Sequence, residues 1–424
     1  MTEVAIIGGG MAGLAAARVL VDHDVDVELF EATDRVGGRA HSEREPDTTI
    51  AIELGPEFVH GEPRSTCRLA HEAGIRLDLI EQEHHVSDHG QLVRAPDLWS
   101  RFGALLCDVP YRDESARAYL DHEPMSDQDR ALFASLVEGF FAAPLDDISI
   151  ASVAADASGP GEPPARQYHV HGGYGRMVDF LAARAAAGGA TIHHGCFVEA
   201  IDWASRPIRI AYRTGGRVDG FATADRVIVT LPVGVLPDVR FDPGLGDHEL
   251  ALRQIAMGQV VKLVLCLREP VLGDHLARRL DFVHASSGAF PTYWLASQED
   301  RHQLTAWAGG PHARALAGQP AEALAERAID GFAEAIGVPR AKVAGAVMHH
   351  HFHDFDADPC FRGAYSYTRA GGIRAAEQLA RPLHDRLYFA GEATDPDYEG
   401  TVAGALASGA RAARQVLRAL RYRA

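Results

Sequence analysis

The sequence predicts an α/β fold with two domains, one of which is assembled from three separate pieces of the chain. Three observations carry this prediction. The 424 residues exceed what one ordinary hydrophobic core accommodates. The chain opens with a strand, a glycine-rich turn, a helix and a second strand, which is the start of a βαβ unit. Similar patterns return in the middle and at the end of the chain, separated by segments of different character.

The opening unit begins with a short apolar strand at residues 4–7. The turn GGGMAG follows at 8–13, and the next run, LAAARVLV, is rich in helix-forming residues with apolar positions on one face. The run VDVELF at 25–30 is the second predicted strand, and Glu31 ends it. These elements predict the first βαβ segment of a nucleotide-binding domain.

Later elements of the same domain are predicted from similar runs. They are a turn and helix within 172–189, a strand pair or one bent strand within 190–203, strands in RIAYRT and RVIVTLP, a strand in RLYFAGEAT, and a long alanine-rich helix over 401–420.

Two intervening segments differ from these. Residues 76–167 mix short helical stretches with prolines and acids, and SGPGEPPA at 158–165 reads as a loop. Residues 246–375 contain the strand-like runs QVVKLVLCL and PTYWLA and an amphipathic helix near 320–336. We therefore predict a first domain from residues 1–75, 168–245 and 376–424, and a second domain from residues 76–167 and 246–375.

Composition limits the class of protein. An apolar fraction of 47% and a charged fraction of 23% are typical of a soluble globular chain. No apolar run reaches the roughly 18 residues that would span a bilayer, and a strand starting at Val4 leaves no room for a signal peptide. Five scattered cysteines favour a reducing compartment and argue against a zinc site. We expect a cytoplasmic protein, monomeric or homodimeric.

The formal net charge of -17 makes a nucleic-acid partner unfavourable. The excess of acidic residues has two interpretations. It attracts a cationic substrate, or it only keeps the protein soluble.

The glycine turn carries a G-x-G-x-x-G spacing at Gly8, Gly10 and Gly13. The first glycine allows the tight turn, the second lets a pyrophosphate approach the backbone, and the third lets the helix lie close to the sheet. The helix start offers free N–H groups to phosphates, and Glu31 would accept hydrogen bonds from a ribose. The turn alone does not distinguish NAD from FAD.

A second tight turn follows in EATDRVGGRA, with Gly37 and Gly38 flanked by Arg35 and Arg39. Arginines and exposed backbone near a diphosphate suit a large dinucleotide that extends across the domain. Surface salt bridges are the alternative interpretation for either arginine.

Lys262 stands out because only two of the 41 basic residues are lysines. It interrupts an apolar strand in which Val260, Lys262, Val264 and Cys266 share one face. A lysine among such neighbours is costly without a purpose. The alternative is an edge-strand lysine that faces solvent.

Taken together, the blocks of this sequence resemble the flavin-containing amine oxidases, a family that includes monoamine oxidases, polyamine oxidases and histone-demethylase-type enzymes. The similar blocks, in the order of the family, are GGGMAGLAAA, EATDRVGGRA, ELGPEFVHG, GGYGRMVDFLA, VIVTLPVGVL, MGQVVKLVL, GAYSYTRAGG and RLYFAGEATDPDYEGTVAGALASGARAA. The resemblance covers nearly the whole chain, and the lysine block and the last two blocks are its most specific parts.

The resemblance implies an FAD-binding, Rossmann-like domain of the glutathione-reductase type with an inserted α+β substrate-binding domain, a mixed sheet flanked by helices. It implies FAD as cofactor, with Glu31 on the adenosine ribose, the Val198 backbone on the adenine, and Glu392 near the ribityl–pyrophosphate part. The residues expected at the cofactor are Gly8, Gly10, Gly13, Glu31, Arg35, Gly38, Arg39, Glu57, Val198, Gly391, Glu392, Thr401 and Val402.

Departures from the family pattern narrow this expectation. Ala364 stands where covalent monoamine oxidases have a cysteine, so the flavin should be dissociable. Those enzymes flank the amine with two tyrosines. Here Tyr365 matches one of them, but Thr401 occupies the other position. Phe355 replaces the tryptophan of a W-x-x-D-P motif. The chain is therefore nearer the non-covalent polyamine-oxidase and demethylase branches.

Four residues are the expected catalytic set: Lys262, Tyr365, His60 and Thr401. The resemblance places Lys262 at the flavin through a bound water, where its ammonium would stabilise the anion that forms when oxygen accepts an electron. Tyr365 would orient the amine nitrogen with its ring, and the alternative is a core tyrosine with a satisfied hydroxyl. Thr401 would cap a helix whose N-terminus faces the flavin. Glu57 and His60 fall in a block that the family places on the substrate side, and His60 would bind substrate or relay a proton, although an ordinary loop histidine is equally consistent.

The run HHHFH at 349–353 suggests a metal site, since alternate strand residues place His349, His351 and His353 on one side. No cysteine or second acid cluster completes an obvious site, so we predict no metal.

Three functions remain open from the sequence. The first is an FAD-dependent amine oxidase that converts an amine, oxygen and water to an aldehyde or ketone, ammonia or a smaller amine, and hydrogen peroxide. The second is another FAD enzyme on the same scaffold: an L-amino-acid oxidase, a dehydrogenase with a different electron acceptor, or a desaturase. The third is a non-catalytic flavin protein.

Overall fold

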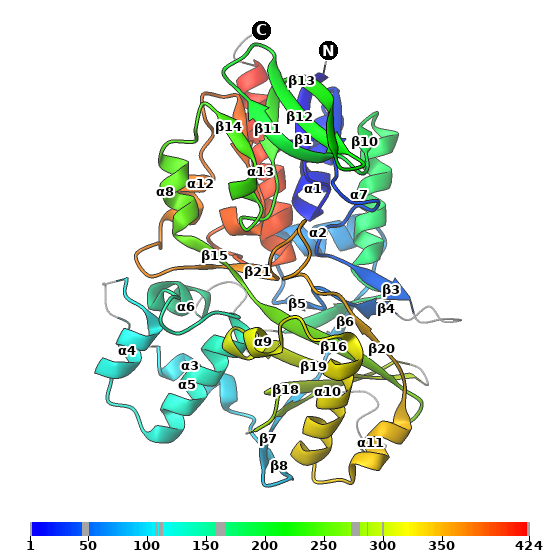
Figure 1. Ribbon diagram of the computed structural model, residues 1–424, viewed down its shortest axis with the longest axis vertical. Coiled ribbons are helices and arrows are strands. Elements are labelled where there is room, and N and C mark those ends of the chain that lie inside the picture. Colours follow the sequence, from blue (N-terminus) through cyan, green and yellow to red (C-terminus); the bar gives the residue numbers. More distant parts are fainter. Residues whose placement is uncertain are drawn as a thin grey trace.

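The computed structural model describes residues 2–44, 51–106, 109, 113–157, 166–272, 280–285, 287–298 and 301–421. The loop predicted at 158–165 lies outside them. Two large sheets lie one above the other, the first in the upper half of Figure 1 with both chain ends, the second in the lower half. The mixed α/β architecture agrees with the predicted fold class.

The first sheet has eight strands. They are β1 (Thr2–Ile7), β2 (Val27–Phe30), β10 (Thr191–His193), β11 (Phe197–Asp202), β12 (Ile208–Thr214), β13 (Arg217–Val229), β14 (Arg240–Asp242) and β22 (Leu387–Phe389). The order is β10-β2-β1-β13-β12-β11-β14, and β22 also pairs with β13. The strands from β10 to β13, together with β22, are parallel, as expected of a nucleotide-binding sheet.

Residues 190–203 contain two strands, but the two do not pair with each other, so the predicted strand pair is wrong in its pairing. Gly195 turns the chain with φ 67°, which separates β10 from β11. β10 then pairs with β2, whereas β11 pairs with β12 and β14. Because a turn between strands does not show which partner each strand takes, the sequence pattern could not have distinguished these pairings.

Helices cover one face of this sheet. They are α1 (Met11–Val21), α2 (Arg64–Glu72), α7 (Gly175–Ala187) and α13 (Val402–Arg421). The small residues of α13 allow its close contact with α1, because a Cβ on Gly409 would lie only 2.1 Å from the Ala12 carbonyl oxygen. None of the described helices combines the length and the apolar character that crossing a bilayer requires.

The second sheet has seven strands. They are β7 (Gln82–Asp88), β8 (Gln91–Arg94), β16 (Val260–Leu267), β17 (Leu280–His284), β18 (Thr292–Gln298), β19 (Arg301–Gly309) and β20 (Val347–Phe352). The order is β20-β16-β19-β18-β17-β7-β8, and only the pair β17–β7 among these is parallel. The sequence did not predict β7 and β8, whose few apolar residues are separated by charged and histidine side chains.

The two faces of the second sheet differ. Leu263 and Leu265 of β16 face a core formed with α9 (Pro311–Leu316), α10 (Ala321–Ala335) and α11 (Arg340–Ala346). The alternate positions face the other way, where Val264 packs with Ile52 and Leu54 and Lys262 lines the cavity described below. A separate group of helices, α3 (Leu98–Ala104), α4 (Ala116–His122), α5 (Asp127–Phe140) and α6 (Ile150–Ala157), packs around its own apolar cluster.

Smaller elements lie between the two sheets. They are the hairpin β3 (Ser42–Arg44) and β4 (Ala51–Glu53), the sheet of β5 (Phe58–His60), β9 (Gln167–Val170) and β6 (Leu77–Ile80), the pair β15 (Ile255–Gly258) and β21 (Tyr365–Thr368), and the 3-10 turn η3 (Glu392–Thr394). The helix α8 (Asp247–Arg253) packs on α12 (Ala375–Leu379) and contributes Ala251 to the core of the first sheet. A boundary after α8, rather than at 245, would describe this packing; the exact domain limits stay a prediction.

Candidate active site

A cavity of ≈ 670 Å³ is bounded by residues of both large sheets and of the elements between them. Most of the residues that the sequence singled out line this cavity. They are Gly8, Gly10, Glu31, Gly38, Arg39, Glu57, His60, Lys262, Tyr365, Gly391, Glu392, Thr401 and Val402. Segments up to 394 residues apart in the sequence therefore meet at one site.

Three predicted cofactor residues lie behind the lining. Gly13 packs α1 against the turn, since a Cβ there would be 2.0 Å from the Gly8 carbonyl oxygen. The side chain of Val198 is buried in the core beneath β11. Arg35 donates from Nη1 to the Gly38 carbonyl oxygen at 3.0 Å, which braces the second glycine turn. These residues would support a ligand through the backbone that they hold in place.

The first glycine turn has the geometry that a diphosphate requires. Gly8 has φ 107°, a conformation that side-chain-bearing residues rarely adopt. Gly10 faces open space, because the nearest atom to a Cβ placed there would be the Gly37 oxygen at 4.0 Å. No side chain caps α1 at Gly10, so its first N–H groups are available to an anion. The turn therefore fits a dinucleotide.

Glu31 is held in a fixed orientation beside the cavity. Its Oε2 accepts from Gly9 N at 2.7 Å, and its Oε1 accepts from Thr33 N and Thr33 Oγ1 at 2.8 Å each. The side chain is only 6% exposed. A carboxylate fixed by short local hydrogen bonds is suited to accept further bonds from a ribose.

Glu392 joins three segments at the centre of the cavity wall. It accepts from Arg39 Nη1 at 2.8 Å, from Ser366 Oγ at 2.6 Å and from Gly400 N at 3.0 Å. Arg39 Nη1 also donates to the Ala364 carbonyl oxygen at 2.9 Å. Because both charges are paired and hydrogen-bonded, burial of this group is tolerable, and it fixes the loop that precedes α13.

Thr401 is the N-cap of α13. Its Oγ1 accepts from Gly404 N at 3.1 Å and donates to the Tyr398 carbonyl oxygen at 2.8 Å. Thr401, Val402 and Ala403 line the cavity, so the positive end of the helix dipole faces it. Thr401 therefore caps the helix as predicted.

Lys262 does not face solvent. β16 lies between β19 and β20 rather than at an edge, and Lys262 is 5% exposed. Its Nζ lies 2.8 Å from Glu57 Oε2 and 3.1 Å from the Gly55 carbonyl oxygen. The alternative of an edge-strand lysine is therefore wrong.

Glu57 is the counter-ion of Lys262, a role that the sequence did not indicate. Burial raises the pKa of Glu57, but Lys262 and His169 together outweigh burial and hold that pKa at about 2. The indole Nε1 of Trp294 lies 3.2 Å from both carboxylate oxygens, and His169 Nε2 lies 3.5 Å from Oε1. The carboxylate is therefore ionised at neutral pH.

Aromatic rings form the wall of the cavity around this ion pair. Phe58 lies against Trp294 with ring centroids 5.7 Å apart, and Phe282 stacks on His84 at 4.8 Å. Trp99 meets Phe140 edge to face at 5.2 Å. Such a wall removes water from a bound substrate and stacks well on cationic or apolar groups.

Tyr365 and His60 are both neutral side chains of this wall. The Tyr365 hydroxyl donates to the Phe140 carbonyl oxygen at 2.6 Å, and burial raises the pKa of Tyr365. Burial lowers the pKa of His60 to about 4. Nδ1 of His60 is buried without a hydrogen-bond partner among the described residues. His60 is thus suited to exchange a hydrogen bond with a ligand rather than to hold a charge.

Two carboxyl groups in the lining were missed by sequence reasoning. Burial raises the pKa of Asp156 to about 6, and burial together with Glu392 raises the pKa of Glu399 to about 7. Glu399 accepts from Thr368 Oγ1 at 2.9 Å. Glu399 falls within a block that had been recognised, so an unexplained acid just before a helix was an available signal. Asp156 offered no such signal, because only the tertiary fold brings α6 to the cavity.

Comparison with known proteins agrees with this geometry. The profile of the family described as flavin containing amine oxidoreductase matches residues 11–417. Protein anon-37Cs of Drosophila melanogaster is 25% identical, over 93% of this chain and 86% of that protein. Polyamine oxidase 3 of Oryza sativa subsp. japonica is 25% identical, over 92% of this chain and 84% of that protein. The chain spans about half of the lysine-specific histone demethylase 1 homolog 2 of Arabidopsis thaliana, with 24% identity over 92% of its own length and 55% of the relative.

Solved structures share the fold. Putrescine oxidase bound to putrescine superposes with a TM-score of 0.83 at 19% identity, covering 98% of this chain and 99% of the other. Cyclohexylamine oxidase from Brevibacterium oxydans gives a TM-score of 0.83 at 18% identity, covering 99% of both chains. The family match over most of the sequence confirms the resemblance, and the fold agrees with it: the chain belongs to the flavin containing amine oxidoreductases.

Proposed function

We propose that this enzyme binds FAD non-covalently and oxidises an amine at the carbon beside its nitrogen. Bound FAD would accept a hydride from that carbon and pass two electrons to oxygen, which with two protons becomes hydrogen peroxide. The nitrogen lone pair forms the C=N bond, and water then hydrolyses the imine to an aldehyde or ketone. The observation that carries the proposal is the buried Lys262 ammonium at the cavity, where an anion derived from oxygen needs a positive charge.

Non-covalent binding is supported by the residues at the expected attachment point. Ala364 has no nucleophile, and its backbone N and O bond to Gly258 and Arg39. The described cysteine that lines the cavity is Cys360, whose pKa is raised to about 11 by burial and the nearby Asp358 carboxylate. A thiol that stays protonated is a poor nucleophile.

The cavity favours a neutral reacting nitrogen. An amine that enters between Tyr365 and the other rings loses water, which lowers its pKa and exposes its lone pair. His60, neutral at pH 7, would accept one hydrogen bond through its unpartnered Nδ1. These residues would orient the substrate, and the cofactor would accept the hydride.

The acids of the lining support a substrate with a second positive charge. Burial is the main cause that raises the pKa of Tyr365 and of Glu399, and the charge of the nearby Asp156 adds to both shifts. An ammonium at the far end of a diamine would neutralise this acidic group while the other nitrogen is oxidised. Putrescine, the diamine bound in one of the structurally similar proteins, belongs to this class.

An amino-acid oxidase is less well supported. A substrate carboxylate needs a cationic clamp, and among the described lining residues the only arginine is Arg39. Arg39 is already paired with Glu392. The peroxide measurement below distinguishes the oxidase from a dehydrogenase that uses another electron acceptor. The cytoplasmic location stays a prediction from the sequence.

One experiment tests the proposal. The yellow protein is purified, its flavin is released by denaturation and identified, and a panel of diamines, monoamines and amino acids is screened for peroxide in air. We expect FAD in the supernatant and peroxide with diamines above monoamines. Flavin that stays on the denatured chain would contradict non-covalent binding. Amine-dependent bleaching of the flavin without peroxide would contradict the oxidase and favour a dehydrogenase.

A further inference from the structure

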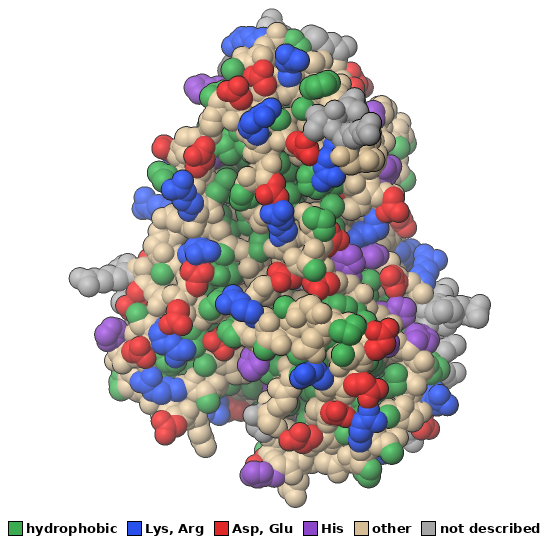
Figure 2. Space-filling view, in the orientation of Figure 1, with side chains coloured by type: hydrophobic (Ala, Val, Ile, Leu, Met, Phe, Trp, Pro, Cys, Tyr) green, Lys and Arg blue, Asp and Glu red, His purple; other side chains and the backbone are tan. Residues whose placement is uncertain are grey.

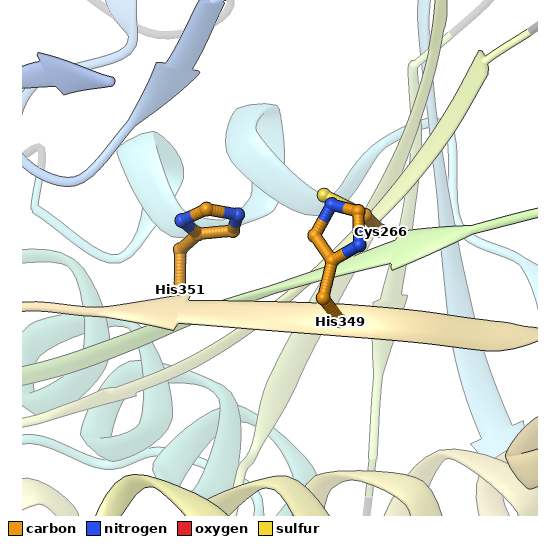
Figure 3. Close-up of side chains that lie close together, drawn as sticks. All are labelled: Cys266, His349 and His351. Atoms are coloured by element: carbon orange, nitrogen blue, oxygen red, sulfur yellow. The ribbon is translucent and has the colours of Figure 1, made fainter. Parts of the chain in front are cut away.

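The second sheet carries a cluster of metal-ligating side chains that takes no part in the proposed oxidation. His349 and His351 project from the same side of β20 toward Cys266 of the adjacent strand β16, as Figure 3 shows. One ligand atom from each of the three lies within 4.8 Å of the others. From this arrangement we propose that Cys266, His349 and His351 bind a late first-row divalent metal ion, Zn²⁺ above all.

The register of the sheet produces the cluster. Cys266 pairs directly with His349, and Val264 pairs with His351, so the thiol and both imidazoles stand on one face. The sequence did not connect Cys266 with the histidine run because β16 and β20 are about 80 residues apart in the chain. His353, which was grouped with the other two, instead contacts Asp358 through Nε2 at 3.0 Å.

The ligand types suit zinc. Cysteine thiolate and histidine imidazole are both ligand types that Zn²⁺ takes, and the fourth position of a tetrahedron would hold water. A tetrahedral zinc site places such ligand atoms about 3.3–3.8 Å apart, so small side-chain rotations bring a cluster with a 4.8 Å limit to this geometry. The His351 side chain is 18% exposed, which leaves a route for the ion.

A second observation points to the same site. His351 Nδ1 lies 2.7 Å from Glu43 Oε2 of β3, while His351 Nε2 is buried and has no hydrogen-bond partner among the described residues. A carboxylate on one ring nitrogen fixes the tautomer in which the other nitrogen is a metal ligand. Glu43 therefore positions the ligand, and metal binding would join the second sheet to the hairpin β3–β4.

Another described group, Glu83, His85 and Asp281, also brings three donor atoms within 4.8 Å of one another. There Arg94 already pairs with Glu83. A guanidinium in contact with a candidate ligand repels a cation, so the proposal is confined to the cysteine–histidine cluster.

The test measures zinc on the flavin-loaded full chain. The protein is stripped with a chelator, equilibrated with micromolar Zn²⁺, desalted and analysed for metal by mass spectrometry. We expect about one zinc per chain in the wild type and in His350→Ala, whose imidazole lies on the same strand between the two ligands. Cys266→Ser, His349→Ala and His351→Ala should each lose it, and Glu43→Gln should weaken binding about 10–100-fold.

Substitution by Co²⁺ adds a readout that folding alone does not move. Thiolate–cobalt absorption bands should appear in the wild type and disappear in Cys266→Ser. Wild-type protein that retains no zinc overturns the proposal without any variant. Equal retention in all three ligand variants, each with its flavin absorbance intact, shows an adventitious ion only and also overturns it.

Discussion

The two ends of the cavity are built in different ways. At the end nearer the first sheet, the contacts come from backbone held by glycines, at the turns 8–13 and 37–38 and at Gly391. At the end nearer the second sheet, they come from side chains such as Phe140, Trp294 and Asp156, which belong to different elements. The end formed by backbone is encoded in short contiguous sequence motifs, whereas the end formed by side chains depends on how distant segments pack.

Lys262 and Glu57 lie where these two ends meet. The lysine belongs to the second sheet and the glutamate to the segment that follows the hairpin β3–β4. Their ion pair connects the two parts through a buried contact, and one partner carries the proposed oxygen chemistry. Substituting each partner of this ion pair in turn therefore separates catalytic from structural effects.

The largest expected effect follows Lys262→Met. Flavin should bind and be reduced by substrate without oxygen, but reoxidation by oxygen should slow about 10³-fold, since the positive charge that stabilises the developing anion is lost. Stopped-flow absorbance of the two half-reactions measures this. Unchanged reoxidation would rule out the role assigned to Lys262. Lys342→Met, on α11, is the matched control.

Glu57→Gln should destabilise the protein by about 3 kcal/mol, because a buried ammonium loses its counter-charge. Since the pKa of Glu57 is lowered from 4.5 to about 2 on folding, the ion pair stabilises fully above the unfolded value and is lost as pH falls toward 2. The difference between variant and wild type in denaturant unfolding should therefore shrink in acid.

Reoxidation in Glu57→Gln should not slow, because the ammonium remains. A slowing as large as in Lys262→Met would mean that the carboxylate, rather than the lysine charge, serves the oxygen reaction. The exposed Glu62→Gln is the control for stability.

Gly13→Ala tests the backbone-built end. A new Cβ would meet the Gly8 oxygen at 2.0 Å, so α1 must move and the phosphate turn with it. Overpacking of this kind costs about 1–3 kcal/mol, which predicts FAD affinity about 10–100-fold weaker. The control is Gly345→Ala in α11, another helical glycine, with nothing within 4 Å of the added Cβ. Equal affinity in the two variants would contradict the packing argument.

The smallest expected effect concerns pH and Asp156. Because burial raises the pKa of Asp156 to about 6 and of Glu399 to about 7, both ionise as pH rises through this range and attract a cationic substrate. Between pH 6 and 8, kcat/KM should rise more for a diamine than for a monoamine. Asp156→Asn should remove about tenfold of the diamine preference. The exposed Asp127→Asn, on α5, should leave it intact, and a preference unaffected by Asp156→Asn would place the second charge elsewhere.

The distribution of surface charges agrees with the expectation that acids inside the cavity attract the cationic substrate. Figure 2 shows acidic and basic side chains interspersed over the visible face, although the formal net charge is -17. Neighbouring charges of opposite sign cancel at distances beyond the Debye length. A preference for cationic substrates then depends on the acids inside the cavity rather than on the total charge.

The sequence by itself determined the strand–turn–helix unit, the glycine turns and the alternation that buries Lys262, because each depends on residues within a few positions of one another. It also determined the N-cap of α13, since Thr401 and Gly404 are near neighbours. Only the tertiary structure decided that Glu57 pairs with Lys262, that Asp156 reaches the cavity, and that Cys266 meets His349 and His351. These contacts join residues far apart in the chain, and their existence depends on strand order and register, for which a local pattern contains no information.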